Sequence, residues 1–267
     1  MAKIGLVAGY GKITKLFADA AKARGDTVVA IALKGVTEED LAGHVEKMYW
    51  FEWGEFQKAL MIAIKERLNK IVLLGKIQKD LLFKGDEKLD SRSKDILTGG
   101  KDRKDYSILK QVANVVGKFG IEIMDPTIYL NDLIPAKGVL TKRRPTPEEE
   151  ADIQYGKEIA SKLAQLDIGQ TVAVKNKTVI AVEAVEGTDE TLKRAGALSK
   201  VGFVMVKAAR PAQDMRFDVP LIGLETLKTL IEASGSVLAL EAGKTLLIDK
   251  DEMIALADQK NISIVII

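Results

Sequence analysis

Short apolar runs alternate with helical patterns along the first half of the chain, and this alternation limits the fold more than any other feature. The runs at 3–9 (KIGLVAG), 27–33 (TVVAIAL) and 70–77 (KIVLLGKI) are typical of buried strands. Amphipathic segments at 55–69 and 106–120 have the period of helices. Strands that alternate with helices of this length predict a parallel, doubly wound sheet.

The pattern changes near 130–150, where three prolines and a basic cluster interrupt it. Thr146, Pro147 and Glu149 form a capping box with proline at the first helical position, which predicts a helix over 147–166. A hairpin that turns at Asn176-Lys177 is predicted over 171–185, followed by a less regular mixture of helices and strands. We therefore expect two α/β domains, an N-terminal Rossmann-like parallel sheet (1–133) and a C-terminal mixed α/β domain (134–267), with the cleft between them as the default place for a ligand.

The side chains present limit the chemistry. The chain has no cysteine and one histidine, His44, which excludes thiolate sites and argues against a Ser-His-Asp triad or a multi-histidine zinc site. Any metal would be held by oxygen ligands, which favours Mg²⁺ or Mn²⁺. Lys and Arg number 40 and Asp and Glu 38, so we expect no nucleic-acid partner. No signal peptide and no long apolar run are present, which predicts a cytoplasmic protein that does not span a membrane.

Two glycine-containing turns follow strands in the first half. Gly9 and Gly11 separate the first strand from the first helix, where the backbone could approach a phosphate. The dinucleotide fingerprint is incomplete, because Thr14 stands where a third glycine or an alanine is required. Lys76 lies at the end of another strand, at the edge where open α/β sheets bind ligands, and it could meet a phosphate as a point charge. Plain turn chemistry and a surface lysine are the alternatives.

An unusual group of acidic residues lies where the predicted hairpin gives way to a helix. Thr188 suits a helix N-cap, and Asp189 in the first turn would favour the helix dipole. Glu183 has no such explanation, since it lies within the predicted strand among Val, Ile and Ala. A buried carboxylate without a partner is costly, so Glu183 must face solvent, a cation or a cleft. Strand alternation puts Glu183 and Glu186 on opposite faces unless the strand bends or ends between them.

Asp218 is the other carboxylate in an apolar setting. It lies in RFDVPLIG (216–223), where Pro220 keeps the preceding residue extended and the segment stiff. An aspartate at a turn or at a helix entry is the alternative to a functional one. Asp167 and Gln170 lie in LDIGQ (166–170), which by itself predicts a loop.

Together these segments resemble the family of LpxI-type UDP-2,3-diacylglucosamine pyrophosphatases of lipid A biosynthesis. The resemblance is essentially end to end, and it is most specific where LDIGQ and EGTD follow one another at this spacing. Two places depart from the family: Ile13-Thr14 replace a common Leu-Pro, and Lys79-Asp80 replace a common Arg-Pro. The segments that carry the resemblance are LVAGYGKI (6–13), DYSILKQV (105–112), LDIGQ (166–170), AVEAVEGTD (181–189) and RFDVPLIG (216–223).

This resemblance implies an Mg²⁺-dependent hydrolase, with Mn²⁺ as an alternative. The implied substrate is UDP-2,3-diacylglucosamine, whose pyrophosphate would be cut by water attack on the phosphate next to the sugar. The implied products are UMP and 2,3-diacylglucosamine 1-phosphate (lipid X). Asp218 matches the aspartate essential for turnover in the family, and we expect Asp218, Glu186 and Asp189 to be catalytic and to hold the metal. The expected substrate contacts are Gly9, Gly11, Lys76, Asp105, Gln170, Thr188 and Glu183.

Two other functions stay open. A non-catalytic nucleotide- or lipid-binding protein could use the same cleft, and a nicotinamide oxidoreductase would rest on the glycine turn alone. Aromatic and leucine residues at 47–56 and 80–85 either pack in a core or line a groove for acyl chains. Such a groove would also explain peripheral contact with the inner face of the inner membrane. The sequence does not indicate the oligomeric state.

Overall fold

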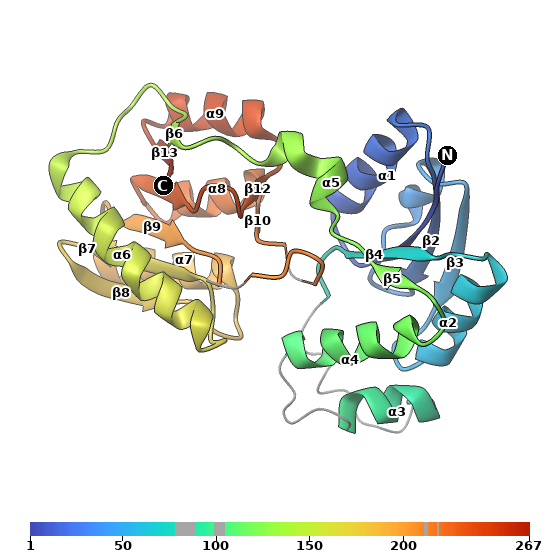
Figure 1. Cartoon of the computed structure of the whole chain (residues 1–267). Helices are drawn as coiled ribbons and strands as arrows, with labels where there is room; N and C mark the ends of the chain where they lie inside the picture. Colours follow the sequence, from blue (N-terminus) through green and yellow to red (C-terminus); the bar gives the residue numbers. More distant parts are fainter. Residues whose placement is uncertain (78–88, 99–104, 211–212, 218) are drawn as a thin grey trace. The chain divides into compact units, whose positions relative to one another are not determined.

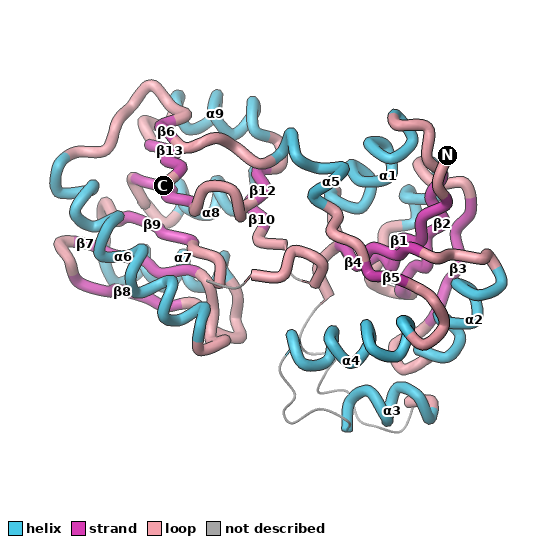
Figure 2. Tube along the Cα trace, viewed as in Figure 1, coloured by secondary structure: helices cyan, strands magenta, loops and turns pink. Residues whose placement is uncertain are grey.

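A computed structural model describes residues 1–77, 89–98, 105–210, 213–217 and 219–267 (Figure 1). The chain divides into two compact units. Unit 1 comprises Met1–Asn131 and a short later segment that begins at Asp214. Unit 2 comprises Asp132–Gln213 and Val219–Ile267. Figure 2 shows strands and helices in both units, which confirms the predicted α/β class.

The described strands of unit 1 form a five-stranded sheet in which every pairing is parallel. The order β3-β2-β1-β4-β5 is that of one doubly wound Rossmann sheet, as the alternating sequence pattern predicts. The strands are β1 (Lys3–Ala8), β2 (Thr27–Leu33), β3 (Lys47–Phe51), β4 (Lys70–Leu74) and β5 (Glu122–Ile123).

Helices connect these strands. One of them, predicted over 55–69, ends earlier than expected, because Arg67 adopts a left-handed conformation with φ 53° that a helix cannot continue through. The described helices of unit 1 are α1 (Ile13–Ala23), the 3₁₀ turn η1 (Glu39–Gly43), α2 (Phe56–Lys65), α3 (Ser91–Thr98), α4 (Asp105–Gly117) and α5 (Thr127–Leu130), and the 3₁₀ turn η4 (Asn131–Leu133) follows at the start of unit 2.

A core cluster of unit 1 lies between its sheet, α2 and α4. Tyr49, Phe51 and Phe56 pack against this cluster, so the aromatic segment at 47–56 contributes to core packing. The other segment considered for an acyl groove, 80–85, lies outside the described residues. Phe217 belongs to the same cluster although it comes from the second half of the sequence, and its exposed fraction is 9%. The core of unit 1 is therefore completed by a residue from far along the chain.

The second unit has a mixed sheet in the order β6-β13-β11-β9-β7-β8. Its centre is parallel, whereas β6 and β7 pair antiparallel with their inner neighbours and β10 pairs with β12 separately. The strands are β6 (Gly138–Val139), β7 (Thr171–Lys175), β8 (Thr178–Val182), β9 (Val204–Lys207), β10 (Leu221–Ile222), β11 (Val237–Leu240), β12 (Leu246–Leu247) and β13 (Ser263–Ile266). The helices are α6 (Pro147–Gln165), α7 (Thr188–Ser199), α8 (Leu224–Glu232) and α9 (Lys250–Gln259).

Alternate residues of these strands face two different cores, as the period of two in a strand requires. On β9, Val204 and Val206 pack with residues of α6, whereas Met205 packs with residues of α7, α8 and α9. The same division holds along β11, where Val237 faces the α6 side and Leu238 the other. Unit 2 is thus a sheet covered by helices on both faces.

Several local predictions for unit 2 are confirmed. The hairpin β7–β8 turns at Asn176 and Lys177, which both have positive φ, as a type I′ turn requires. Thr146 and Glu149 form the expected capping box at the start of α6, with Pro147 at the first helical position. Among the described residues no helix is both long and apolar enough to cross a membrane.

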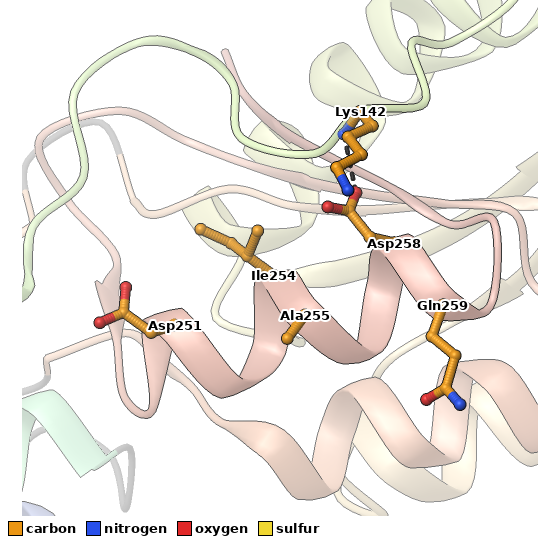
Figure 3. A pocket seen from close by; sticks show the side chains of 6 residues that line it. All are labelled: Lys142, Asp251, Ile254, Ala255, Asp258 and Gln259. Carbon is orange, nitrogen blue, oxygen red and sulfur yellow. Dashed lines mark hydrogen bonds between the residues drawn. The ribbon is translucent and has the colours of Figure 1, made fainter.

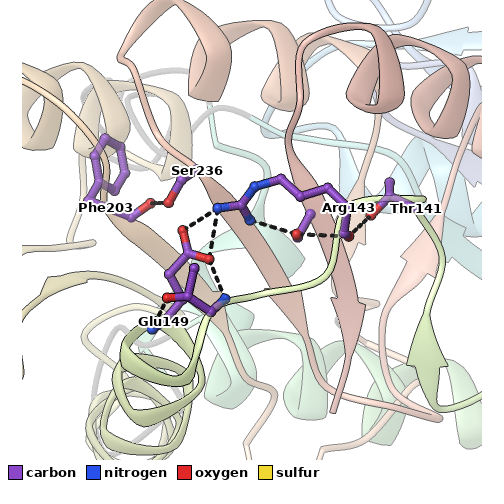
Figure 4. Close-up of polar contacts among 7 residues, drawn as sticks. Thr141, Arg143, Glu149, Phe203 and Ser236 are labelled. Atoms are coloured by element: carbon purple, nitrogen blue, oxygen red, sulfur yellow. Dashed lines mark hydrogen bonds and ion pairs between the residues drawn. The ribbon is translucent and has the colours of Figure 1, made fainter.

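An ion pair fixes the start of α6 to the amino-terminal edge of the sheet (Figure 4). Arg143 donates to both carboxylate oxygens of Glu149 at 2.8 and 2.9 Å, and also to the hydroxyl of Ser263 at the start of β13. Burial raises the pKa of Glu149, but Arg143 and Ser236 outweigh that effect and keep the pKa below its usual value. These contacts explain a charged pair at this edge without any ligand.

Candidate active site

The opposite, carboxyl-terminal edge of the unit 2 sheet carries a second charged cluster. β9 ends at Lys207, and its antiparallel neighbour β7 begins directly opposite, at Thr171. β8 ends at Val182, so Glu183 follows immediately at the same edge. Open α/β sheets bind ligands outside the carboxyl ends of their parallel strands. The topology therefore brings a lysine, a threonine and a glutamate together where a ligand site is expected.

Both carboxylate oxygens of Glu183 accept hydrogen bonds. Thr188 donates its hydroxyl to Oε1 at 2.9 Å, and the backbone N–H of Gln170 donates to Oε2 at 3.2 Å. The ammonium of Lys207 lies 3.8 Å from Oε2. The side chains of Glu183 and Lys207 are 13% and 8% exposed. The expectation that Glu183 must face solvent, a cation or a cleft is confirmed, and its partner is a cation.

The electrostatic effects on Glu183 oppose one another. Burial raises the pKa of Glu183, because desolvation disfavours the charged form. The positive charge of Lys207 and hydrogen bonds from Thr171, Thr188 and the Gln170 backbone lower the pKa of Glu183 and outweigh burial. The net pKa lies below its usual value, so Glu183 is a carboxylate at neutral pH.

Two local predictions around Glu183 are wrong. The strand β8 ends at Val182, so Glu183 does not lie within a strand and alternation does not decide where it points. Thr188 is the first residue of α7, whose N-cap is Gly187 with φ 84°. A glycine tolerates this left-handed conformation, and the Thr188 hydroxyl is directed to Glu183.

The turn before β7 approaches Glu183 closely. A side chain on Gly169 would place its Cβ 2.1 Å from the backbone oxygen of Glu183, which only glycine avoids. This close approach positions the N–H of Gln170 to donate to the Glu183 carboxylate. Asp167, in the same turn, pairs with Arg210, which follows β9. The sequence LDIGQ (166–170) predicts only a loop, but two of its residues, Asp167 and Gln170, contribute to the charged edge.

Glu186 and Asp189 lie beside this cluster in sequence, but each has a different partner. Glu186 pairs with Arg194 at 2.7 Å and accepts from Thr191. Asp189 accepts from the hydroxyl of Thr226 on α8 at 3.0 Å. Over the described ranges, no group of three His, Cys, Asp or Glu side chains could hold a metal ion. The third expected ligand, Asp218, lies outside the described residues, so the expected set of three is not tested.

In unit 1 the predicted residues lie at the carboxyl edge of its sheet. A Cβ on Gly9 would lie 2.8 Å from the backbone of Gly75, and Tyr10 exchanges two backbone hydrogen bonds with Lys76. The glycine at 9 is therefore needed to pack two turns together. Gly11, with φ 114°, has open space around its Cα, and the Lys76 side chain is exposed.

Asp105, also predicted to contact substrate, is the first residue of α4, and its side chain lies outside the described part of the structure. A separate pocket lies along α9 (Figure 3). None of the predicted site residues lines it. Its lining consists of Lys142, Asp251, Ile254, Ala255, Asp258 and Gln259.

Sequence reasoning missed Lys207. The available signal was a lysine at the end of an apolar strand (GFVMVKAA, 202–209), the same signal that drew attention to Lys76. Nothing in the sequence shows that β7 pairs antiparallel with β9, and this pairing brings Lys207 to Glu183 and Thr188.

Comparisons with known proteins cover nearly the whole chain. The family model described as the LpxI N-terminal domain matches residues 3–133, and the one described as the LpxI C-terminal domain matches residues 136–265. The chain is 29% identical over 270 residues to the UDP-2,3-diacylglucosamine pyrophosphatase LpxI of Caulobacter vibrioides, with 97% of this chain and 95% of that protein covered.

Similarity to solved structures is weak. The biotin carboxylase subunit of pyruvate carboxylase has a TM-score of 0.29 and 14% identity, with 75% of this chain and 42% of that chain covered. The N5-carboxyaminoimidazole ribonucleotide synthetase of Thermotoga maritima has a TM-score of 0.26 and 14% identity, with 68% and 41% covered. The chain thus spans less than half the length of these two proteins, and scores of this size support no conclusion about its fold or function.

Proposed function

The chain belongs to the LpxI family, and we propose on this basis that it is a hydrolase that cuts the pyrophosphate of UDP-2,3-diacylglucosamine in lipid A biosynthesis. The structural observation that supports this proposal is the Glu183–Thr188–Lys207 cluster at the carboxyl edge of the unit 2 sheet. A carboxylate kept ionised there can accept a hydrogen bond from a water molecule and direct it toward a phosphorus atom.

The proposed products are UMP and lipid X. In this reaction the oxygen of water forms a bond to the phosphorus next to the sugar, and the bond from that phosphorus to the bridging oxygen breaks. The bridging oxygen leaves with UMP, and the water oxygen stays on the sugar phosphate. Positioning of the water and stabilisation of the phosphoryl oxygens account for most of the catalysis in such a transfer.

We further propose that Mg²⁺ is required, with Mn²⁺ as an alternative. A divalent cation would neutralise charge on the pyrophosphate, which carries several negative oxygens. Mg²⁺ is commonly bound by one or two carboxylates together with substrate phosphates, so a complete protein cage is not needed. Asp218 with Glu186 or Asp189 would supply these ligands. Glu186 is paired with Arg194, and Asp189 accepts from Thr226. The metal would therefore have to displace Arg194 or Thr226 from its carboxylate partner.

The experiment is a turnover assay on the purified full chain with UDP-2,3-diacylglucosamine dispersed in detergent, with UMP release as the signal. We expect turnover with Mg²⁺, loss of turnover after chelation with EDTA, and recovery on adding Mg²⁺ or Mn²⁺. Asp218→Ala should lose turnover, whereas the matched variant Asp251→Ala, on the exposed surface of α9, should keep it.

Other outcomes would change the proposal in different ways. Full turnover by Asp218→Ala would overturn the assigned role of that residue, and turnover in EDTA would overturn the metal requirement. Tight binding of the lipid without release of UMP under any metal condition would contradict the hydrolase proposal and favour a binding protein.

Because the proposed substrate carries two acyl chains, we also propose peripheral contact with the inner face of the inner membrane. Flotation of the protein with vesicles that contain the substrate should exceed flotation with vesicles that lack it. Equal recovery in both fractions would contradict this contact.

A further inference from the structure

Lys207 is a buried lysine at the end of a buried strand. All four residues of β9 are buried, and the Lys207 side chain is 8% exposed. Placing an ammonium in such a position is costly unless it is paired and hydrogen-bonded. Lys207 donates to the Thr188 hydroxyl at 3.0 Å and to the Thr171 hydroxyl at 3.3 Å, whereas its distance to the Glu183 carboxylate is 3.8 Å. Its shortest contacts are therefore to hydroxyls, and its charge partner is farther away.

The direction of these hydrogen bonds is fixed by chemistry. An ammonium can only donate, so the Thr188 hydroxyl accepts from Lys207. The single proton of that hydroxyl is then directed to Oε1 of Glu183, 2.9 Å away. The other oxygen of Glu183 accepts from the backbone of Gln170. A chain of donors thus runs from Lys207 through Thr188 to Glu183, and the carboxylate is held at both oxygens.

Other charged pairs of unit 2 make direct contact. Arg143 and Glu149 are joined by two hydrogen bonds, and Arg210 contacts Asp167 directly. In contrast, the hydroxyl of Thr188 connects Lys207 to Glu183. The carboxylate is therefore held in place while Lys207 takes up none of its hydrogen-bond acceptor positions. A carboxylate has about four lone-pair positions, and Thr188, Thr171 and the Gln170 backbone donate three hydrogen bonds to Glu183. Glu183 therefore keeps the capacity to accept from a further donor such as water.

From these contacts we propose that Lys207 is a positioning residue for the hydrolysis, acting through Thr188 to hold Glu183 in the orientation that receives the attacking water. This inference rests on the function proposed above. The start of α7 supports it, because Thr188 is the first residue of a 12-residue helix whose N-terminal end favours an anion such as a carboxylate or phosphate nearby.

The central experiment compares Lys207→Met with Lys193→Met in the UMP-release assay on the full chain. Lys193 is an exposed lysine of α7 and serves as the matched control. We expect Lys207→Met to lower kcat about tenfold or more with KM changed by less than about threefold, because the proposed role concerns orientation during reaction. Lys193→Met should leave both constants unchanged. Lys207→Met should also lower the Tm, since it leaves a buried carboxylate without its cation.

A double variant separates positioning from simple charge compensation. Lys207→Met combined with Glu183→Gln removes both charges and should regain most of the lost Tm, yet kcat should stay low because no oriented carboxylate remains. A further pair keeps the charges and changes only the intervening hydroxyl. Thr188→Ser, which keeps the hydroxyl, should retain a kcat at least about tenfold above that of Thr188→Val, whereas Thr188→Val should lower kcat as Lys207→Met does.

Each outcome bears on the proposal. Recovery of kcat together with Tm in the double variant would show that Lys207 only compensates a buried charge. Wild-type kcat in Lys207→Met or in Thr188→Val would also overturn the positioning role. If Lys207→Met fails to fold, the double variant and the two Thr188 variants still decide. A wild-type protein without turnover would overturn the proposed function itself, an outcome distinct from active variants beside an active wild type.

Discussion

The carboxyl edges of the two sheets are lined in different ways. In unit 1, two turns meet through the backbone of Gly9 and Gly75. In unit 2, the corresponding edge holds the buried side chains of Lys207 and Glu183, joined by Thr188. Edges with the same place in the topology therefore offer different chemistry. The glycine edge is packed backbone against backbone, and the charged edge holds an oriented carboxylate.

The largest difference between the edges should appear when a methyl group is added at the glycine of each. Gly169→Ala would place Cβ 2.1 Å from a backbone oxygen, and Gly9→Ala would place it 2.8 Å from backbone atoms. We expect a loss of about 4 kcal/mol or more in the free energy of unfolding for Gly169→Ala, and about 1–3 kcal/mol for Gly9→Ala. Denaturant unfolding measures both.

Gly43→Ala is the matched control, because a Cβ there meets nothing within 4 Å and its φ is not positive. Its effect should be near zero or slightly stabilising. Equal losses at positions 169 and 9 would contradict the idea that the charged edge of unit 2 is the more tightly constrained one.

The next effect concerns the core of unit 1. Phe217→Ala should cost about 3–5 kcal/mol, because it removes a buried aromatic ring from a packed cluster. Hydrogen exchange should show lost protection in β4, β5, α2 and α4, while β9 and β11 of unit 2 stay protected. If β9 and β11 lost protection from hydrogen exchange instead, the result would contradict the division into two separately packed units.

The sequence was sufficient for the parts of the fold that depend on local patterns. The alternation of strands and helices predicts the parallel sheet of unit 1, Asn176-Lys177 predicts the hairpin turn of unit 2, and Thr146 with Glu149 predicts the start of α6. Long-range packing was not predictable. No local pattern shows that Phe217 returns to the core of unit 1.

In the candidate site, too, the local sequence predicts some features but not those that depend on long-range packing. The sequence marks Glu183 as unusual, because a carboxylate in an apolar run needs a partner, but it does not identify that partner. Lys207 becomes visible only through the pairing of β7 with β9. The tight approach of Gly169 to the Glu183 backbone is likewise a property of two segments that are distant in sequence.

Acidification should weaken unit 1 through Glu66, which pairs with Lys3 at the start of β1 and with Lys47 at the start of β3. Hydrogen bonds from Lys3 and Tyr49, and to a smaller extent from Lys47, lower the pKa of Glu66 to about 2, from an ordinary value of 4.5. A carboxylate with a depressed pKa in the folded state stabilises the protein fully above its unfolded pKa, and this stabilisation is lost as it is protonated. We therefore expect stability to fall as the pH drops from 4.5 towards 2.

Glu66→Gln should lower stability at pH 7 and flatten the dependence in that acidic range. Thermal unfolding monitored between pH 7 and pH 2 is the measurement. Glu149→Gln serves as the comparison in unit 2, where Arg143 keeps the pKa of Glu149 low against the effect of burial. An unchanged acid profile in Glu66→Gln would mean that other carboxylates set the acid limit.

The smallest effect is expected at the start of α6. Thr146→Ala removes the side chain that accepts from the Glu149 backbone and should cost about 1 kcal/mol. Thr146→Ser should keep most of that stability. Neither change should alter kcat, because the capping box lies at the amino-terminal edge of the sheet and Glu183 at the other. A loss of kcat in Thr146→Ala would show that the two edges are coupled.

The place of Phe217 has a consequence for how this protein can be divided or recombined. A cut at the junction between the two matched segments separates the sequence cleanly, but the N-terminal piece then lacks an aromatic side chain that fills its interior. A chimera that joins halves from two relatives would bring a foreign residue into that interior. The two halves should therefore be taken from the same relative. An isolated N-terminal piece should become fully compact only when a tethered peptide supplies Phe217.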